Sequence, residues 1–324
     1  MRPRFYCTIA ATALTLATAA FAAPVEVEQG IKPYVKASGI SGNLNSIGSD
    51  TLNNLMTLWA EDFKKLYPSV RIQVEGKGSS TAPPALISST AQLGPMSREM
   101  KSTEIDAFEA KFGYKPMEVR VAIDALAVYV NKDNPLQKLT LPEVDAIFSK
   151  ARGCGLPDDI ANWGQVGLAD PWEAKPISMY GRNSASGTYG FFKTVALCDG
   201  DFKDTVKEQP GSASVVQGVT EDLLGIGYSG IGYKTSGVKT LEIATKPDEP
   251  YYGTDAQTVL AGKYPLSRSL LIYVNRKPGT ELDPLIHQFL AYVLSREGQQ
   301  VVVKDGYLPL PAAVIAGEVK KLAK

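Results

Sequence analysis

Three short loops combine glycine, serine and threonine directly before a predicted helix, a pattern that suits anion binding. They are Ser49-Asp50-Thr51, Gly78-Ser79-Ser80-Thr81 and Ser186-Gly187-Thr188. Backbone N–H groups at a helix start lack partners inside the helix, and the helix dipole adds partial positive charge there. Hydroxyl side chains supply further donors. The alternative is that these serines and threonines only cap their helices, which is a common role for them.

An arginine precedes the third loop at a spacing that would place a cation beside it. Arg182 lies four residues before Ser186. A guanidinium offers two parallel donors to an oxyanion, so it fits recognition of phosphate, sulfate or carboxylate groups. A surface ion pair is the alternative for an arginine judged on spacing alone. Both interpretations stay open on these residues.

Enzyme motifs are weak in this chain. Residues 225–230 spell G-x-G-x-x-G, but this string follows a predicted helix and enters a strand, the reverse of the dinucleotide fingerprint. Residues 234–237 and 236–239 resemble two β-lactamase boxes, yet they overlap where the enzyme needs them far apart. His287 is the only histidine, and no G-x-S-x-G elbow accompanies it. We therefore predict no catalytic residues and no enzyme.

Composition limits the partners. One histidine and three cysteines exclude most zinc sites built from those ligands, while oxygen-ligand sites stay open. We predict no metal and no cofactor. The chain holds 34 lysines and arginines against 34 aspartates and glutamates. Because nucleic-acid binders usually carry a clear basic excess, we predict no nucleic-acid partner.

The first 22 residues have the pattern of an export signal. Arg2 and Arg4 precede an apolar run over residues 5–23, and residues 20–22 form a small-x-small cleavage pattern. A membrane anchor is the alternative, but the run is rich in alanine and threonine and so only weakly apolar. We predict cleavage near Ala22 and a periplasmic location, with release outside the cell as a further option. The mature chain would carry a net charge of about −2, since only two arginines are lost.

Two cysteines remain after the predicted cleavage, Cys154 and Cys198. In an exported protein an isolated pair most simply forms one disulfide, here closing a loop of roughly 45 residues. Two buried free thiols are the alternative. On the loop-entropy estimate such a bridge stabilises the fold by roughly 3–4 kcal/mol.

Strands and helices alternate along the chain and would position the loops. Apolar residues at 3–4 spacing between Leu52 and Leu66 predict a clear helix. Two long apolar runs, residues 119–130 and 266–275, suit buried strands that pass between domains, and Asp124 interrupts the first. The alternation predicts an α/β protein with largely parallel sheets.

In this order the loops resemble those of PstS-type phosphate-binding proteins. The resemblance covers the mature chain from about Leu44 to Pro311 and is closest to pseudomonad members. The spacing R-x-x-x-S-G-T together with the G-S-S loop is specific, whereas either alone would be weak. The segments that carry it are residues 48–51, 78–80, 93–97, 182–188, 225–228 and 304–311.

The resemblance implies a type II periplasmic binding fold with two α/β lobes, two crossing strands between them and the ligand cleft between the lobes. It divides the chain into a signal peptide at 1–22, an N-terminal extension at 23–45, lobe 1 at 46–120 plus 268–324, and lobe 2 at 121–267. The implied function is high-affinity binding of inorganic phosphate and its delivery to the permease subunits of an ATP-driven ABC transporter, by a protein that we expect to be monomeric. The implied phosphate site consists of Ser49, Asp50, Thr51, Ser79, Ser97, Arg182, Ser186, Gly187 and Thr188.

This chain departs from the family pattern at two places. The best-known members have Thr-Phe where this chain has Asp50-Thr51, and an aspartate where it has Ser97. That aspartate accepts a hydrogen bond from the proton on phosphate, which excludes fully ionised sulfate. Our hypothesis is that Asp50 has taken this role; the alternative is that it only caps the following helix. Asp124, at a common family position, is expected to orient Arg182.

Two other functions stay open on the sequence. A secreted phosphate-ester hydrolase could use the same loops, although the chain lacks an evident nucleophile–base pair. A surface adhesion or signalling protein could have kept the binding fold. The extension at 23–45, which the core fold does not need, is the only feature that favours this last function.

Overall fold

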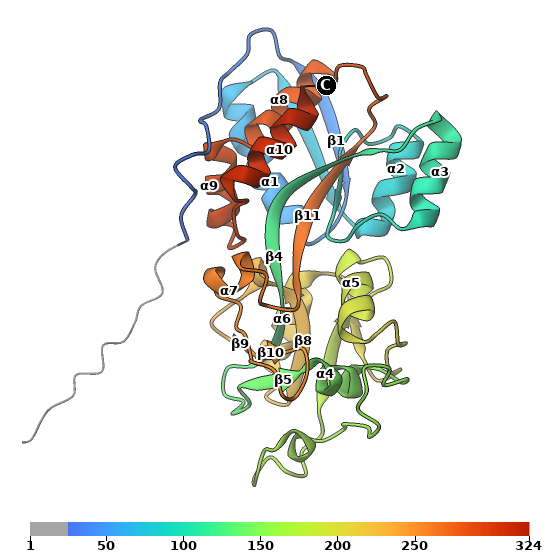
Figure 1. Cartoon of the computed structure of the whole chain (residues 1–324), viewed down its shortest axis with the longest axis vertical. Coiled ribbons are helices and arrows are strands. Elements are labelled where there is room, and N and C mark those ends of the chain that lie inside the picture. Colours follow the sequence, from blue (N-terminus) through green and yellow to red (C-terminus); the bar gives the residue numbers. More distant parts are fainter. Residues whose placement is uncertain (1–24, 324) are drawn as a thin grey trace, which may run out of the picture.

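The chain folds into two lobes that are linked by two long strands (Figure 1). The structure is a computed structural model that describes residues 25–323, and the predicted signal peptide at 1–22 lies outside these residues. The linking strands are β4 (Met117–Asn131) and β11 (Ser267–Val274). The expected class, two α/β lobes joined by crossing strands, is confirmed. Within the described residues, every helix is too short or too polar to span a membrane.

Lobe 1 is built on short strands whose carboxyl ends meet beside the other lobe. β1 (Gly42–Gly48) pairs in parallel with β2 (Val70–Gly76). β3 (Gly94–Met96) lies beside the end of β1: the N–H of Ser49, the residue after β1, donates to Pro95 O at 2.7 Å. Its helices are η1 (Ser79–Thr81), α1 (Asn53–Leu66), α2 (Ala82–Ile87), α3 (Ser102–Phe112), α8 (Pro284–Val293), α9 (Arg296–Lys304) and α10 (Ala312–Leu322).

The amphipathic pattern of α1 explains how the first loop is held. Leu55, Met56, Trp59 and Phe63 recur at 3–4 spacing and are buried in the core of lobe 1. Trp59 Nε1–H also donates to Gly298 O at 2.8 Å, which ties α1 to α9. Because α1 is fixed in this way, the loop that precedes it has a defined place at the edge of the lobe.

Residues 25–41 form an irregular segment that packs on lobe 1. Ile31 is only 2% exposed and belongs to the lobe 1 core, and Arg296 Nε donates to Ile31 O at 3.1 Å. β1 already begins at Gly42 and pairs with β2 from there. The last part of the segment expected to be an extension, 23–45, is therefore a strand of the lobe 1 sheet.

Lobe 2 repeats the arrangement of a sheet with helices around it. Its strands β6, β7 and β8 are parallel, and β8 and β9 each pair antiparallel with β4. Its strands are β5 (Lys138–Thr140), β6 (Ser178–Arg182), β7 (Lys207–Gln209), β8 (Gly225–Gly230), β9 (Val238–Thr240) and β10 (Glu242–Ala244). Its helices are α4 (Leu141–Phe148), η2 (Trp163–Val166), α5 (Gly187–Ala196), α6 (Ser212–Glu221), η3 (Ile231–Tyr233) and α7 (Ala256–Leu260).

The predicted disulfide is present in lobe 2. Cys154 and Cys198 are bonded, with their Cα atoms 5.5 Å apart, and 44 positions separate them in the sequence. The bridge joins the loop after α4 to the end of α5. Free thiols at these two positions are therefore excluded.

The crossing strands make one sheet that spans both lobes. Its strand order is β3-β11-β4-β8-β6-β7, with β9 also paired to β4. β4 pairs with β11 as far as Ala125 and with β8 from Leu126 onward, so the sheet passes from one lobe to the other between these residues. The expectation of largely parallel sheets is wrong for this region, because β11 returns through the same layer in the direction opposite to β4.

Candidate functional site

Three serines of lobe 1 meet at the cleft. Ser49 follows β1, Ser79 opens η1 and Ser97 follows β3. The Ser49 hydroxyl donates to Ser97 Oγ at 3.0 Å, and the Ser97 N–H donates to Ser79 Oγ at 3.0 Å. All three side chains are buried. The neighbouring ends of β1 and β3 thus gather hydroxyls from separate parts of the sequence into one cluster.

The loop before α5 faces this cluster from lobe 2. Ser186 is the N-cap of α5, and its Oγ accepts hydrogen bonds from the N–H groups of Thr188 at 3.1 Å and Tyr189 at 3.4 Å. Ser186 therefore caps its helix, which is the role that the sequence analysis gave as the alternative to anion binding. Thr188 Oγ1 also lies 2.8 Å from Thr51 Oγ1 of lobe 1, so the loop makes a direct contact across the cleft.

Gly187 shows how tightly the lobes approach each other. A Cβ atom at this position would lie 2.8 Å from Ser79 Cβ and 2.7 Å from Ser97 Oγ. Real Cβ contacts are almost never this short. The absence of a side chain at Gly187 is therefore what lets lobe 2 close on the serine cluster.

Arg182 lies at the end of β6, and its side chain is buried in the closed structure. Its Nη1 donates to Ser212 Oγ at 2.7 Å, and its Nη2 donates to Pro210 O at 3.3 Å. The side chain is 1% exposed. Its Nε–H is also buried and has no hydrogen-bond partner among the described residues. Burial lowers the pKa of the Arg182 guanidinium, while the nearby Asp50 carboxylate opposes this shift.

Asp50 reaches across the cleft from lobe 1. Its Oδ2 lies 3.1 Å from Arg182 Nη1 and accepts the Ser212 N–H at the start of α6 at 2.8 Å. Its backbone oxygen accepts the Tyr233 hydroxyl at 2.8 Å. The N-cap position of α1 is Leu52, and no side chain makes a cap bond there. The alternative that Asp50 only caps this helix is therefore wrong.

A second ion pair lies where the crossing strands pass between the lobes. Asp124 Oδ2 accepts hydrogen bonds from Arg268 Nε at 2.9 Å and Nη2 at 2.7 Å. Arg268 also donates from Nη1 to Ser97 O at 2.8 Å and from Nη2 to Thr188 Oγ1 at 2.9 Å. The expectation that Asp124 orients Arg182 is thus wrong: Asp124 holds Arg268, and Arg182 pairs with Asp50 instead.

Sequence reasoning missed Arg268 as part of this site. Its signal is weak in the sequence, because it is one charged residue within a long apolar strand. Asp124 plays the same part in β4, and the strand register places the two residues opposite each other. Ser212 and Tyr233 were missed as well. Ser212 has the local signal of a helix start, since it follows Gly211 at the beginning of α6, but that signal does not show that it faces lobe 1. Tyr233 has no such signal and reaches the site through η3.

The residues of the expected phosphate site lie where the two lobes meet, and all of them except the carboxylate of Asp50 can contribute hydrogen-bond donors. This set of donors contains the serine cluster, the hydroxyls of Thr51 and Thr188, the start of α5, and the unpartnered Arg182 Nε–H. Both arginines already have a carboxylate partner, so the charges balance before any ligand is considered. Residues 25–323 contain no group of acidic, histidine or cysteine side chains that could hold a metal ion. Such a set fits a small oxyanion.

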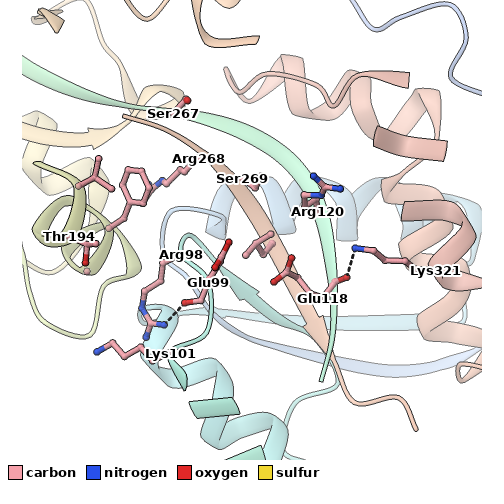
Figure 2. Close-up of a pocket in the computed structure, with 14 residues that line it drawn as sticks. Arg98, Glu99, Lys101, Glu118, Arg120, Thr194, Ser267, Arg268, Ser269 and Lys321 are labelled. Carbon is pink, nitrogen blue, oxygen red and sulfur yellow. Dashed lines mark hydrogen bonds between the residues drawn. The ribbon is translucent and has the colours of Figure 1, made fainter. Parts of the chain in front are cut away.

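A cavity of about 660 Å³ adjoins this site on the side of β4 and β11. Figure 2 shows that Arg98, Arg120, Arg268 and Lys321 line it together with Glu99 and Glu118. Its basic side chains are largely neutralised by acidic neighbours, for example Arg98 by Glu104 at 2.6 Å and Lys321 by Glu318 at 2.7 Å. Arg182, which carries the unpartnered donor, does not line this cavity.

The family model and the relatives with high sequence identity point to phosphate-binding proteins. The model of the PBP superfamily domain matches residues 23–297. The phosphate-binding protein PstS of Pseudomonas aeruginosa is 57% identical over 97% of this chain and 97% of its own length. Two solved structures share the fold. One, assigned to a phosphate ABC transporter substrate-binding protein of Clostridium perfringens and holding phosphate, has a TM-score of 0.70 at 24% identity and covers 83% of this chain and 100% of its own. The other, an ABC-type phosphate transport receptor of Vibrio cholerae, has a TM-score of 0.64 at 23% identity with the same coverage.

Proposed function

The chain belongs to the PBP superfamily and, within it, to the PstS phosphate-binding proteins, and from this premise we propose that it binds inorganic phosphate between its lobes. The bound phosphate is delivered to the permease subunits of a phosphate ABC transporter. The protein works as a monomer in the periplasm, after export directed by residues 1–22. The similarity to a PstS protein over nearly the whole length of both chains supports this assignment.

The observation that carries the proposal is the unpartnered Nε–H of Arg182. A buried donor without an acceptor costs on the order of 1–3 kcal/mol, and more when the group is charged. Nearly all buried polar groups in proteins are paired for this reason. An oxygen of phosphate would supply the acceptor, and the hydroxyls of the serine cluster and the start of α5 would donate to the other oxygens.

Asp50 gives this site a means to prefer phosphate over sulfate. A carboxylate next to an anion is repulsive unless it accepts a proton from that anion. Phosphate carries such a proton near neutral pH, and sulfate does not. In Asp50, Oδ2 contacts lobe 2 through Arg182 and Ser212. The other carboxylate oxygen, Oδ1, makes no hydrogen bond to the described residues. In the proposed complex Oδ1 accepts the phosphate proton.

Titration calorimetry with phosphate, sulfate and arsenate tests the ligand assignment. We expect the protein to bind phosphate, and Arg182→Gln to weaken this binding by about 100-fold or more, because a charged hydrogen bond in a buried site is lost. Arg71→Gln is the matched control, since Arg71 is exposed on β2 and makes no contact with the cleft. Absence of heat at millimolar phosphate, or equal loss in both variants, contradicts the proposal.

Delivery is tested separately in cells. A strain that lacks its own phosphate-binding protein should regain high-affinity phosphate uptake when it expresses this chain together with a cognate permease. Fractionation of the same cells checks the periplasmic location, and size-exclusion chromatography checks the monomer. Hydrolysis of p-nitrophenyl phosphate by the purified protein would instead support the phosphate-ester hydrolase that the sequence left open.

A further inference from the structure

Asp50 joins the two lobes through one carboxylate oxygen. Oδ2 contacts Arg182 Nη1 at 3.1 Å and the Ser212 N–H at 2.8 Å, and both partners belong to lobe 2. We call this pair of contacts the Asp50 bridge. The other direct contacts across this part of the cleft pair two neutral groups, such as the hydroxyls of Thr51 and Thr188 at 2.8 Å, or a charged group with a neutral one, such as Arg268 Nη2 with Thr188 Oγ1 at 2.9 Å. Among these contacts between the lobes, the Asp50 bridge is the one that pairs opposite charges.

Closure of the cleft carries an electrostatic cost that the bridge offsets. In the closed structure the Arg182 side chain is 1% exposed, and Asp50 is the acidic group within ion-pair distance of it among the described residues. Burial alone lowers the pKa of Arg182, which means that it disfavours the charged form, and Asp50 is the largest opposing influence. A cation that becomes buried without a counter-charge would strongly disfavour the closed state.

The N-terminus of α6 strengthens the same contact. Ser212 is the first residue of this ten-residue helix, and its N–H points at Asp50 Oδ2. An anion is favoured at such a position by the unpaired N–H groups and the helix dipole. Asp50 therefore gives lobe 2 two attractions that depend on its negative charge, and Asn at this position would keep only the shape of the contact.

We propose that the Asp50 bridge closes the two lobes without any ligand, so that this protein is substantially closed before phosphate arrives. In that role Asp50 is a positioning residue: it holds Arg182 Nη1, which leaves the Nε edge of the guanidinium for the ligand. The proposed effect of the Asp50 bridge concerns only the opening and closing of the lobes, and it does not depend on which anion binds. Its test therefore uses protein free of phosphate, and it can fail while the proposed function holds, or hold while that function fails.

The experiment measures the distance between the lobes by pulsed electron spin resonance. Spin labels are attached at Lys111→Cys on α3 and Gln217→Cys on α6, which are exposed positions on different lobes, while the native cysteines are bonded to each other. We expect the dialysed, phosphate-free protein to show a mainly short distance. Asp50→Asn should lower its closed-to-open ratio by about tenfold, because a charged hydrogen bond is replaced by a neutral one.

Three further variants separate the effect of charge from general damage to the fold. Tyr233→Phe removes another contact across the cleft, the hydroxyl that donates to Asp50 O, and should change the ratio much less. Asp106→Asn on α3 is the matched control, since this carboxylate is exposed and makes no ion pair across the cleft, and should change nothing. In an Arg182→Gln background, Asp50→Asn should add little, since its main partner is gone. An open phosphate-free protein, or a ratio that Asp50→Asn and Asp106→Asn leave equally unchanged, overturns the proposal.

Discussion

Gly187→Ala tests directly whether the closed arrangement of the lobes is the one that binds phosphate. The new Cβ would lie 2.8 Å from Ser79 Cβ, and ordinary contacts begin at 3.4 Å. Ser79 Oγ can rotate away, but Ser79 Cβ is fixed to the backbone. The lobes must therefore separate by about 0.6 Å at this point, or the backbone of one lobe must shift by as much.

A separation of this size would weaken the contacts that surround the ligand. The bond between Thr51 Oγ1 and Thr188 Oγ1 would lengthen from 2.8 Å toward 3.4 Å, beyond the usual range for a hydroxyl pair. Overpacking of this kind typically costs about 1–3 kcal/mol. The ligand-free protein can open to relieve this contact, whereas the phosphate-bound protein cannot. The dissociation constant for phosphate should therefore rise, by up to about 150-fold, since about 1.4 kcal/mol corresponds to a factor of ten.

Titration calorimetry gives the affinity, and calorimetric melting of the ligand-free protein shows that the fold is intact. Alanine is a better helix former than glycine by about 1 kcal/mol, so the melting temperature should not fall. Gly190→Ala is the control on the same helix, because its Cβ would meet Arg98 Cδ at 3.2 Å, near the end of a flexible side chain. If Gly187→Ala binds phosphate as tightly as the wild type does, the closed contact between Gly187 and Ser79 is not that of the bound state.

Three further predictions concern stability. Asp124→Asn should lower the free energy of unfolding by about 3–5 kcal/mol and weaken phosphate binding, because it leaves the buried Arg268 without its counter-charge; chemical denaturation that shows no change would contradict this. Replacing Cys154 and Cys198 by serine should cost about 3–4 kcal/mol in the same assay, as the unfolded chain is no longer constrained. Burial raises the pKa of the Asp305 carboxyl to about 6, so the folded state holds this proton more tightly than the unfolded state and stability is lost as pH rises from about 4 to about 6. Asp305→Asn should therefore raise the melting temperature at pH 7.5 and not at pH 4, and an equal shift at both would refute the assignment.

Local chemistry in the sequence was sufficient to find the loops of the site. Ser49, Ser79 and Ser186 each sit where a strand ends and a helix starts, and such positions are recognisable from residue types alone. The crossing strands were predictable for a similar reason, since long apolar runs need burial on both faces. Whether neighbouring strands run parallel or antiparallel was not predictable, because a sequence pattern does not show which strands pair with each other.

The partners of the charged residues were beyond sequence reasoning. Arg268 and Asp124 are 144 positions apart, and only the antiparallel register of β11 and β4 brings them together. Asp50 meets Ser212 across 162 positions, and this contact joins one lobe to the other. The family pattern suggested Asp124 as the partner of Arg182, whereas the structure pairs Arg182 with Asp50. Pairings of this kind depend on tertiary geometry that neither spacing nor composition records.

A slightly acidic protein can bind an anion because attraction at a distance and affinity at the site are separate properties. The net charge is zero for the whole chain and about −2 after the predicted cleavage, so it offers no long-range steering toward phosphate. Inside the cleft, Arg182 and Arg268 already have carboxylate partners, so a phosphate that enters does not neutralise a free cation. Its binding must instead come from hydrogen bonds in a site shielded from water, where they are stronger than in solution. If Asp50 Oδ1 accepts the phosphate proton as proposed, the same arrangement favours selectivity, because an anion without a proton meets the Asp50 carboxylate at close range with no hydrogen bond to offset the repulsion.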